Sequence, residues 1–333
     1  MSHKQRLYLY PFEHSNAFIR RTKEAFYELG YHPQSFKKLF ALRNLFNRNH
    51  NAVVLNWYED QPFRKGLNIV TRPLFIISFV LTLIGMRLFS NNVVWVRHNF
   101  KPHNVVKASI LYKCVTGMLQ IIANKVVTLE PTPEIKALVV KHPLYKDDAQ
   151  LLSTMHASQQ HDKSIDYLYF GSIKPYKRLD ALLAVWPEDK ALVIAGYCSD
   201  HNHAAELRQL IRARHLKVTW ENAFLSDEEL ENTVACSRFV ILPHDDNAMI
   251  SSGTFYYALG LGANIICFDS AFARGKAREF PFVKIVDRQQ LASQLDAVTY
   301  VGSNEVLSRA YHLYNEKAVA ESWRPVLSHT RFT

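Results

Sequence analysis

Cysteine is scarce and scattered in this chain of 333 residues. Its four cysteines have no CxxC spacing, which excludes a disulfide scaffold or a cysteine zinc site and predicts free thiols in a reducing compartment. Glycine (11) and proline (13) are too few for a fibrous or low-complexity chain. No signal peptide is expected, because the residues after Met1 lead into only a short apolar run.

Acidic residues are scarce in the first half. Up to residue 150 there are 21 Lys and Arg against 9 Asp and Glu, whereas the remainder has 19 against 21. Such a basic half suits an anionic membrane surface, phosphorylated substrates or nucleic acid. Nucleic acid is the least favoured, because no known binding motif accompanies the charge.

A long apolar run lies within the basic half. Residues 74–86 read LFIISFVLTLIGM between Arg72 and Arg87, and thirteen residues are too few to span a bilayer. The run is either a buried helix or a monotopic element that dips into the cytoplasmic leaflet through Phe75, Phe79 and Leu83. We favour the second interpretation, in which basic side chains meet lipid phosphates. They are Lys37, Lys38, Arg43, Arg48, Arg64, Lys65, Arg72 and Arg87.

Short apolar runs alternate with amphipathic segments along the chain, which predicts α/β domains with parallel sheets. The expected strands are 7–10, 52–55, 93–97, 125–128, 166–170, 191–195, 217–220, 239–242 and 264–268. The expected helices are 15–29, 74–86, 109–122, 179–185, 204–214, 227–235 and 253–261. The polar segment 145–164 is expected to be a linker, so two similar domains, 1–150 and 151–310, would place ligands between the carboxyl ends of their sheets.

Two constellations in the second domain suit a bound anion. In FGSIKPYKR (170–178) a strand ends at Gly171, and Lys174 and Lys177 follow in a turn that suits a diphosphate. The alternative is an ordinary turn with solvated lysines.

The second constellation is PHDDNAMISSGTFYYALGL (243–261), in which a helix opens on hydroxyls and backbone N–H groups. Its hydroxyl-rich start comprises Ser251, Ser252, Gly253 and Thr254. Simple N-capping by serine is the alternative. His244, Asp245 and Asp246 are adjacent residues on one loop and seldom make a complete metal site, so no metal is predicted.

A third constellation lies in the basic half. Glu59 and Asp60 follow one strand, and His98 and His103 follow another. A carboxylate or imidazole there is suited to take a proton from an acceptor hydroxyl. The alternative is that these residues cap loops or form ion pairs.

Four blocks in this order resemble the GT-B glycosyltransferases, which have two Rossmann-like domains facing across a cleft. The likeness is greatest to the xanthan-pathway glycolipid 4-β-mannosyltransferases. It is carried by LNWYED (55–60), VVWVRHNFKPH (93–103), YFGSIKPYKRLDALL (169–183) and FVILPHDDNAMISSGTFYYAL (239–259).

The resemblance implies inverting transfer of mannose from GDP-mannose to a polyprenyl-diphosphate-linked oligosaccharide, for an exopolysaccharide, at the cytoplasmic face of the bacterial inner membrane. The nucleotide-sugar is a co-substrate, and no other cofactor is implied. Lys177 occupies the position that binds donor phosphate, and residues 252–254 the helix start over the diphosphate. Glu59 and His98 occupy acceptor-side positions, and we expect the base to be Glu59, then His98, then Asp60.

Departures from the retaining members of the fold favour inversion. Many retaining GT-B enzymes have an arginine at the position of Ser172. They also have two glutamates at the positions of Met249 and Tyr257. The loop 223–225 is expected near the nucleobase. The resemblance also implies that a final helix, around Glu305 to Trp323, returns to the first domain over 311–333. A UDP-sugar donor and a degenerate, non-catalytic membrane-binding module remain the alternatives.

Overall fold

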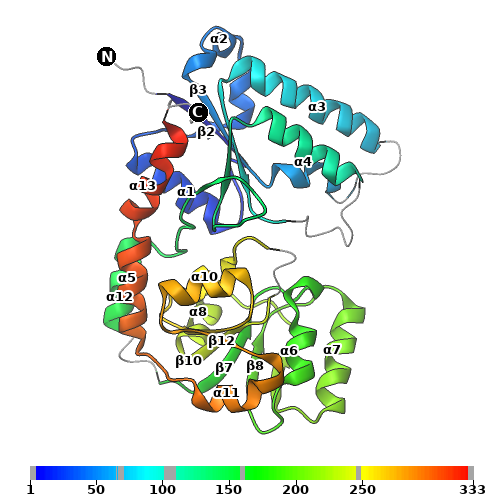
Figure 1. Ribbon diagram of the computed structural model, residues 1–333, viewed down its shortest axis with the longest axis vertical. Helices are drawn as coiled ribbons and strands as arrows, with labels where there is room; N and C mark the ends of the chain where they lie inside the picture. The colour runs from blue at the N-terminus through cyan, green and yellow to red at the C-terminus, as the bar shows by residue number, and fades with distance from the viewer. Residues whose placement is uncertain are drawn as a thin grey trace. The chain divides into compact units, whose positions relative to one another are not determined.

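The computed structural model describes residues 5–64, 66, 71–100, 110–157, 162–244 and 249–328 (Figure 1). The chain divides into two compact units. Unit 1 comprises Met1–Pro143, Asn247–Ser251 and Glu316–Thr333, and unit 2 comprises Leu144–Asp246 and Ser252–Asn315. The first change of unit therefore follows Pro143 instead of residue 150, and the last follows Asn315 instead of residue 310.

Unit 1 is built on a six-stranded parallel sheet in the order β2-β1-β3-β4-β5-β6. Its register pairs Leu9 with Ser35 on one side and with Val54 on the other. The chain thus leaves β1 toward β2 and later returns to its opposite side, so the topological switch lies between β1 and β3. The strands are β1 (Arg6–Tyr10), β2 (Gln34–Ser35), β3 (Asn51–Asn56), β4 (Asn92–Arg97), β5 (Lys125–Thr128) and β6 (Leu138–Val139).

Helices cover both faces of this sheet (Figure 1), because successive strand residues point to opposite sides. Leu7 and Leu9 pack with α1 and α13, whose Phe26 and Trp323 rings meet at 5.0 Å. Tyr8 packs on the other face, with α3 and α4. The helical segments are α1 (Ala17–Glu28), η1 (Phe36–Phe40), α2 (Leu42–Leu45), η2 (Arg48–His50), η3 (Tyr58–Phe63), α3 (Thr71–Phe89), α4 (Ile110–Ile122) and α13 (Glu316–Leu327).

Helix α3 has 19 residues, not the thirteen that the apolar run predicts. Within the described residues it alone is long and apolar enough to cross a membrane, and only 17 % of its most apolar window is buried. Phe79 and Leu83 are core residues at 3 % and 2 % exposure, so the expected lipid-facing stripe is wrong. A different stripe is exposed, made of Leu74, Ile77, Leu81, Ile84 and Leu88.

Unit 2 has a second six-stranded parallel sheet, in the order β12-β11-β10-β7-β8-β9. This is the doubly wound order with its switch point between β7 and β10. The strands are β7 (Ile165–Phe170), β8 (Leu192–Ala195), β9 (Val218–Glu221), β10 (Ser237–Leu242), β11 (Asn264–Phe268) and β12 (Val283–Val286).

Two hydrophobic clusters lie on the two faces of this sheet. Helices α6, α7 and α11 pack on one face, and α5, α8, α9, α10 and α12 contribute to the other. The helical segments are α5 (Asp148–Ala157), η5 (Pro175–Lys177), α6 (Leu179–Val185), α7 (His201–Ala213), α8 (Asp227–Ala235), α9 (Gly253–Leu259), α10 (Ala271–Glu279), η6 (Arg288–Gln290), α11 (Leu291–Ala297) and α12 (Ser303–Tyr314).

Two sequence expectations are corrected here. The expected linker 145–164 contains α5, which starts with a reciprocal cap: Gln150 N donates to Asp147 Oδ1 at 2.7 Å, and Asp147 N donates to Gln150 Oε1 at 3.0 Å. The expected final helix is two helices, because Asn315 adopts an extended backbone between α12 and α13.

Candidate functional site

Three of the residues that the sequence predicts for donor binding, Gly171, Lys177 and Thr254, meet at the switch point of the unit 2 sheet. Gly171 follows β7 with φ +100°, a left-handed conformation that favours glycine. A Cβ on Gly171 would lie 3.4 Å from Lys177 Nζ and 3.6 Å from Thr254 Oγ1. The end of β7, η5 and the start of α9 therefore converge on one point that a side chain would fill.

Lys177 brings a buried positive charge to this point. Its side chain is 8 % exposed, and burial followed by the charge of Lys174 lowers the pKa of its ammonium to about 8. No carboxylate of the described residues pairs with it. Burial and then Lys177 lower the pKa of His244 to about 3, so this imidazole stays neutral. A positive charge that is buried and uncompensated suits an anionic ligand.

The hydroxyls at the start of α9 have separate roles. Ser252 Oγ accepts from Phe255 N at 3.3 Å, so Ser252 is the N-cap that the simpler interpretation expects. A side chain at position 253 would clash with Tyr145, because a Cβ on Gly253 would lie 2.6 Å from the Tyr145 hydroxyl. Ser251 belongs to unit 1, and its Oγ is buried without a hydrogen-bond partner in the described part of the chain.

Next to this point lies a feature that sequence reasoning missed. Gly196 follows β8, and a Cβ on it would come within 2.1 Å of the Gly171 carbonyl oxygen. The following residue, Tyr197, packs its ring at 4.3 Å on Phe224, which is 80 % exposed. The loop 223–225 was expected near the nucleobase, and Tyr197 adds a second ring to it. The signal in the sequence is the Ala-Gly-Tyr that ends strand β8.

The two predicted catalytic carboxylates, Glu59 and Asp60, lie on η3 in unit 1. Trp57 precedes them with φ 50°, a left-handed conformation that costs a non-glycine residue about 1–3 kcal/mol. Glu59 is 2 % exposed, and its Oε2 accepts from Trp95 Nε1 at 2.9 Å. Burial, then the charge of Asp60, raises the pKa of Glu59 to about 7. Asp60 is half-buried, and burial raises its pKa to about 6.

His98 is a buried and well-packed residue. Its Nε2 lies 3.0 Å from Asn56 Oδ1, and its ring stacks on Trp57 at 4.3 Å. The His98 carbonyl accepts from Ile250 N at 3.3 Å. These contacts favour the structural interpretation of His98 over a role as base. His103 lies outside the described residues.

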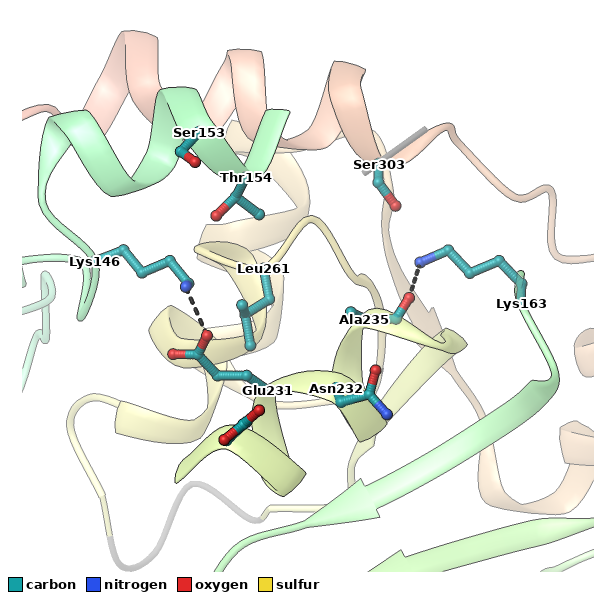
Figure 2. Close-up of a pocket in the computed structure, with 10 residues that line it drawn as sticks. Lys146, Ser153, Thr154, Lys163, Glu231, Asn232, Ala235, Leu261 and Ser303 are labelled. Carbon is teal, nitrogen blue, oxygen red and sulfur yellow. Dashed lines mark hydrogen bonds and ion pairs between the residues drawn. The ribbon is translucent and has the colours of Figure 1, made fainter. Parts of the chain in front are cut away.

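A separate cavity of about 550 Å³ lies in unit 2 (Figure 2). None of the site residues predicted from the sequence lines it. Lys146 is paired with Glu231 at 2.7 Å, and Lys163 donates to the Ala235 carbonyl at 2.6 Å. Its two cations are therefore already engaged, and we assign no chemistry to it.

Across the described residues no group of three or more His, Cys, Asp and Glu side chains has a metal-holding arrangement. Asp245 and Asp246 lie outside those residues. Tyr257 packs on Tyr145 and Phe170, and Met249 forms an antiparallel bridge with Asn99.

Several solved structures resemble this chain. No protein-family model and no curated protein matches it. TarM aligns over 84 % of this chain, with a TM-score of 0.53 and 11 % identity, and the chain spans 55 % of TarM. AviGT4, a glycosyltransferase involved in avilamycin A biosynthesis, aligns over 98 % of this chain and 99 % of its own, with a TM-score of 0.56 and 15 % identity.

A trehalose-6-phosphate structure from E. coli, bound with UDP-2-fluoro glucose, aligns over 98 % of this chain and 99 % of its own. Its TM-score is 0.55 and its identity is 11 %. At such identities the likeness concerns the fold. Both the two parallel-sheet units and these neighbours show that the chain has the GT-B fold, with two Rossmann-like domains.

Proposed function

We propose that the chain is a glycosyltransferase whose donor, a nucleoside-diphosphate sugar, binds to unit 2. The observation that carries this proposal is the buried Lys177, which pairs with no carboxylate of the described residues, beside Gly171 and Thr254 at the switch point. Ligands of open α/β sheets bind at that place, and a diphosphate supplies the missing negative charge. The packed rings of Tyr197 and Phe224 offer an aromatic surface to the nucleobase.

The transfer is a displacement at the anomeric carbon. The acceptor oxygen forms a bond to this carbon while the bond to the diphosphate breaks. Negative charge develops on the leaving diphosphate, where the Lys177 ammonium and the Thr254 hydroxyl stabilise it. The acceptor proton passes to a carboxylate, and the sugar is inverted.

We assign the base to Asp60 instead of Glu59. Both have a pKa raised by burial into the range that suits a base near neutral pH. Asp60 is half-buried and so partly open to solvent, whereas Glu59 is buried and accepts a hydrogen bond from Trp95. The charge of Asp60 in turn contributes to the raised pKa of Glu59.

Two donor classes have support. The sequence resemblance favours GDP-mannose and a β-mannosyl product. The E. coli neighbour, which is bound with UDP-2-fluoro glucose, makes a UDP-sugar the second candidate.

The acceptor in this proposal is a polyprenyl-diphosphate-linked oligosaccharide at the cytoplasmic face of a bacterial inner membrane. Support comes from the apolar face, which we define as the exposed apolar residues of α2, α3 and α4 together with Phe46. Helix α3 contacts both α2 and α4, and α3 and α4 lie side by side in Figure 1. The apolar face comprises Leu42, Leu45, Phe46, Leu74, Ile77, Leu81, Ile84, Leu88, Ile110 and Ile121.

Charge complements this face. Between residues 29 and 129 the chain has 13 Lys and Arg but only two acidic residues, Glu59 and Asp60. Exposed apolar side chains among basic ones are typical of a surface that enters an anionic leaflet.

The test is a calorimetric and thermal-shift screen with GDP, GDP-mannose, UDP and UDP-glucose. A ligand of the folded state at one hundred times its Kd raises stability by about 2.7 kcal/mol. We expect one nucleotide class to bind and Lys177→Ala to abolish binding, while Lys217→Ala, an exposed lysine of unit 2, leaves it unchanged. If UDP binds and GDP does not, the donor is a UDP-sugar and the assignment of GDP-mannose is wrong. No binding to the folded protein would overturn the transferase and favour a non-catalytic module.

A further inference from the structure

We infer that a cavity at the switch point of the unit 1 sheet binds the lipid-diphosphate end of the acceptor. The inference rests on the proposed function and names the site for one of its substrates. The cavity measures about 880 Å³. Its walls come from the end of β1 and the loop after it, from β2 and η1, and from η3 and α3.

The position of this cavity follows from topology. Leu9 and Tyr10 end β1, Ser35 ends β2, and Tyr58 lies just after β3. The chain reverses direction across the sheet between β1 and β3, so this is the crevice in which open α/β sheets bind ligands. Unit 2 has its donor-side cluster at the equivalent place.

Aromatic rings pack into a fixed wall of the cavity. Tyr10 and Tyr58 meet edge-on at 4.9 Å, and Tyr58 stacks on Phe79 at 5.2 Å. Phe36 meets Tyr10 at 5.8 Å and Phe40 at 5.3 Å. Rings held by one another in this way make a preformed apolar surface, which suits a hydrocarbon chain.

Helix α3 connects this cavity with the apolar face. Phe75, Phe79 and Thr82, at helical spacing, line the cavity. Leu74, Leu81 and the rest of the exposed stripe occupy another side of the same helix, at 66 % and 63 % exposure for these two. A lipid whose distal chain lies in the leaflet against one side of α3 can then place its diphosphate and the adjoining hydrocarbon in the cavity on the other side of the helix.

Three cations lie at or beside the cavity. Lys37 and Lys38 on η1 line it and are exposed, and no carboxylate of the described residues pairs with either. Arg64 lies over the ring of Phe75, a lining residue, at 4.4 Å. Glu13 is the one carboxylate in the described lining. An apolar wall with several cations at its edge matches an amphiphile with an apolar chain and a diphosphate.

The cavity is linked to the proposed base through η3. Tyr58 and Gln61 of this six-residue helix line the cavity, and Asp60 lies between them in sequence. A lipid diphosphate bound in the cavity thus brings the first sugars attached to it toward the carboxylates.

The experiment measures binding of farnesyl diphosphate, a soluble isoprenoid diphosphate, to the full chain by calorimetry. The comparison ligands are farnesol, inorganic diphosphate and dihexanoyl phosphatidic acid. We expect farnesyl diphosphate to bind best, and the double variant Lys37→Ala/Lys38→Ala to lose about tenfold or more in affinity. Lys113→Ala/Lys136→Ala removes the same charge from exposed positions outside the cavity and is expected to change affinity little.

A second variant tests the apolar wall. Ser78→Trp places a large ring in the cavity from an exposed position on α3, and we expect it to abolish binding while the protein still melts cooperatively. The assignment of the cavity would be wrong if all variants bound farnesyl diphosphate with the affinity of the wild type. It would also be wrong if inorganic diphosphate bound as tightly as farnesyl diphosphate. If phosphatidic acid bound as tightly as farnesyl diphosphate, the ligand of the cavity would be a phospholipid and the isoprenoid assignment would be wrong.

The two proposals fail separately. If a nucleotide binds and depends on Lys177 but farnesyl diphosphate does not bind, the cavity assignment is wrong and the transferase stands. If farnesyl diphosphate binds through Lys37 and Lys38 but no nucleotide binds, the cavity is a lipid-diphosphate site and the transferase is wrong.

Discussion

Trp95 Nε1 donates a hydrogen bond of 2.9 Å to Glu59 Oε2 in the interior of unit 1. The indole is a neutral donor, and its hydrogen bond only partly opposes burial, which raises the pKa of Glu59 to about 7. Glu59 therefore exchanges its proton near neutral pH inside a core. This has a consequence for stability as well as for chemistry.

The first prediction concerns the free energy of unfolding as a function of pH. The pKa of Glu59 is raised from 4.5 to about 7 in the folded protein, so folding favours its protonated form. The stability from this group is fully present below pH 4.5 and is lost as pH rises to about 7. Glu59→Gln keeps the neutral form, so its stability should exceed that of the wild type by only about 1 kcal/mol at pH 5 but by about 3 kcal/mol at pH 8.

Urea unfolding at pH 5 and pH 8 checks this prediction. Glu28→Gln, at an exposed position on α1, is the matched control and should show no such divergence. Parallel curves for Glu59→Gln and the wild type would mean that Glu59 is ionised in the fold at no cost.

The second prediction concerns the donor site. The pKa of Lys177 is lowered to about 8, and only the ammonium form attracts a diphosphate. Donor affinity should therefore fall as pH rises above 8, by up to about tenfold per pH unit. Lys177→Arg keeps its charge, so it should bind without this pH dependence. Calorimetry from pH 7 to pH 9.5 measures both curves, and a wild-type affinity that stays constant over this range would exclude Lys177 as the diphosphate ligand.

The third prediction separates the two carboxylates. Asp60→Asn should lower kcat about 10²-fold to 10⁴-fold and leave the donor Kd unchanged, because loss of the base affects only the proton transfer. Glu59→Gln should retain most of kcat, because Glu59 takes no part in the proton transfer. Release of nucleoside diphosphate from the bound donor class is the measurement. The reverse order of effects would assign the base to Glu59.

Much of the fold was predictable where local signals are strong. The segments 125–128, 179–185, 227–235 and 264–268 were predicted with the bounds that the structure gives. Helix α8 is one example, because Ser226 and Glu229 form a capping box before it. Helix α5 was missed, because its polar sequence has little amphipathic contrast and its start depends on an Asp and Gln cap.

The site was predictable only in part. Gly171, Lys177 and Thr254 were all named from the sequence, because a glycine-ended strand and a helix start are local patterns. The pairing of Trp95 with Glu59 and of Gly196 with Gly171 depends on strand order, which local patterns do not contain. The exposed stripe of α3 was misassigned because apolar residues lie on every side of that helix, so periodicity offers no contrast.

The fourth prediction tests the close approach of Gly196 and Gly171. A Cβ on residue 196 would lie 2.1 Å from a backbone oxygen, so Gly196→Ala must displace the end of β7 and weaken donor binding as well as stability. Gly275→Ala is the matched control, because nothing lies within 4 Å of its Cβ in helix α10. It should gain about 0.5–1 kcal/mol. Thermal melts and calorimetry measure both, and an unchanged donor affinity in Gly196→Ala would contradict the prediction.

The fifth prediction concerns the apolar face. Leu81 and Ile84 are exposed on α3, so Leu81→Glu/Ile84→Glu should leave the fold intact while removing contact with lipid. We expect the wild type to sediment with vesicles that contain phosphatidylglycerol, less so at high salt, and the double variant to lose about tenfold or more in partitioning. Leu152→Glu, at a similarly exposed leucine in α5, is the control and should bind like the wild type. If the folded double variant still binds vesicles, α3 is not the membrane contact, and the lipid would have to reach the cavity from another side.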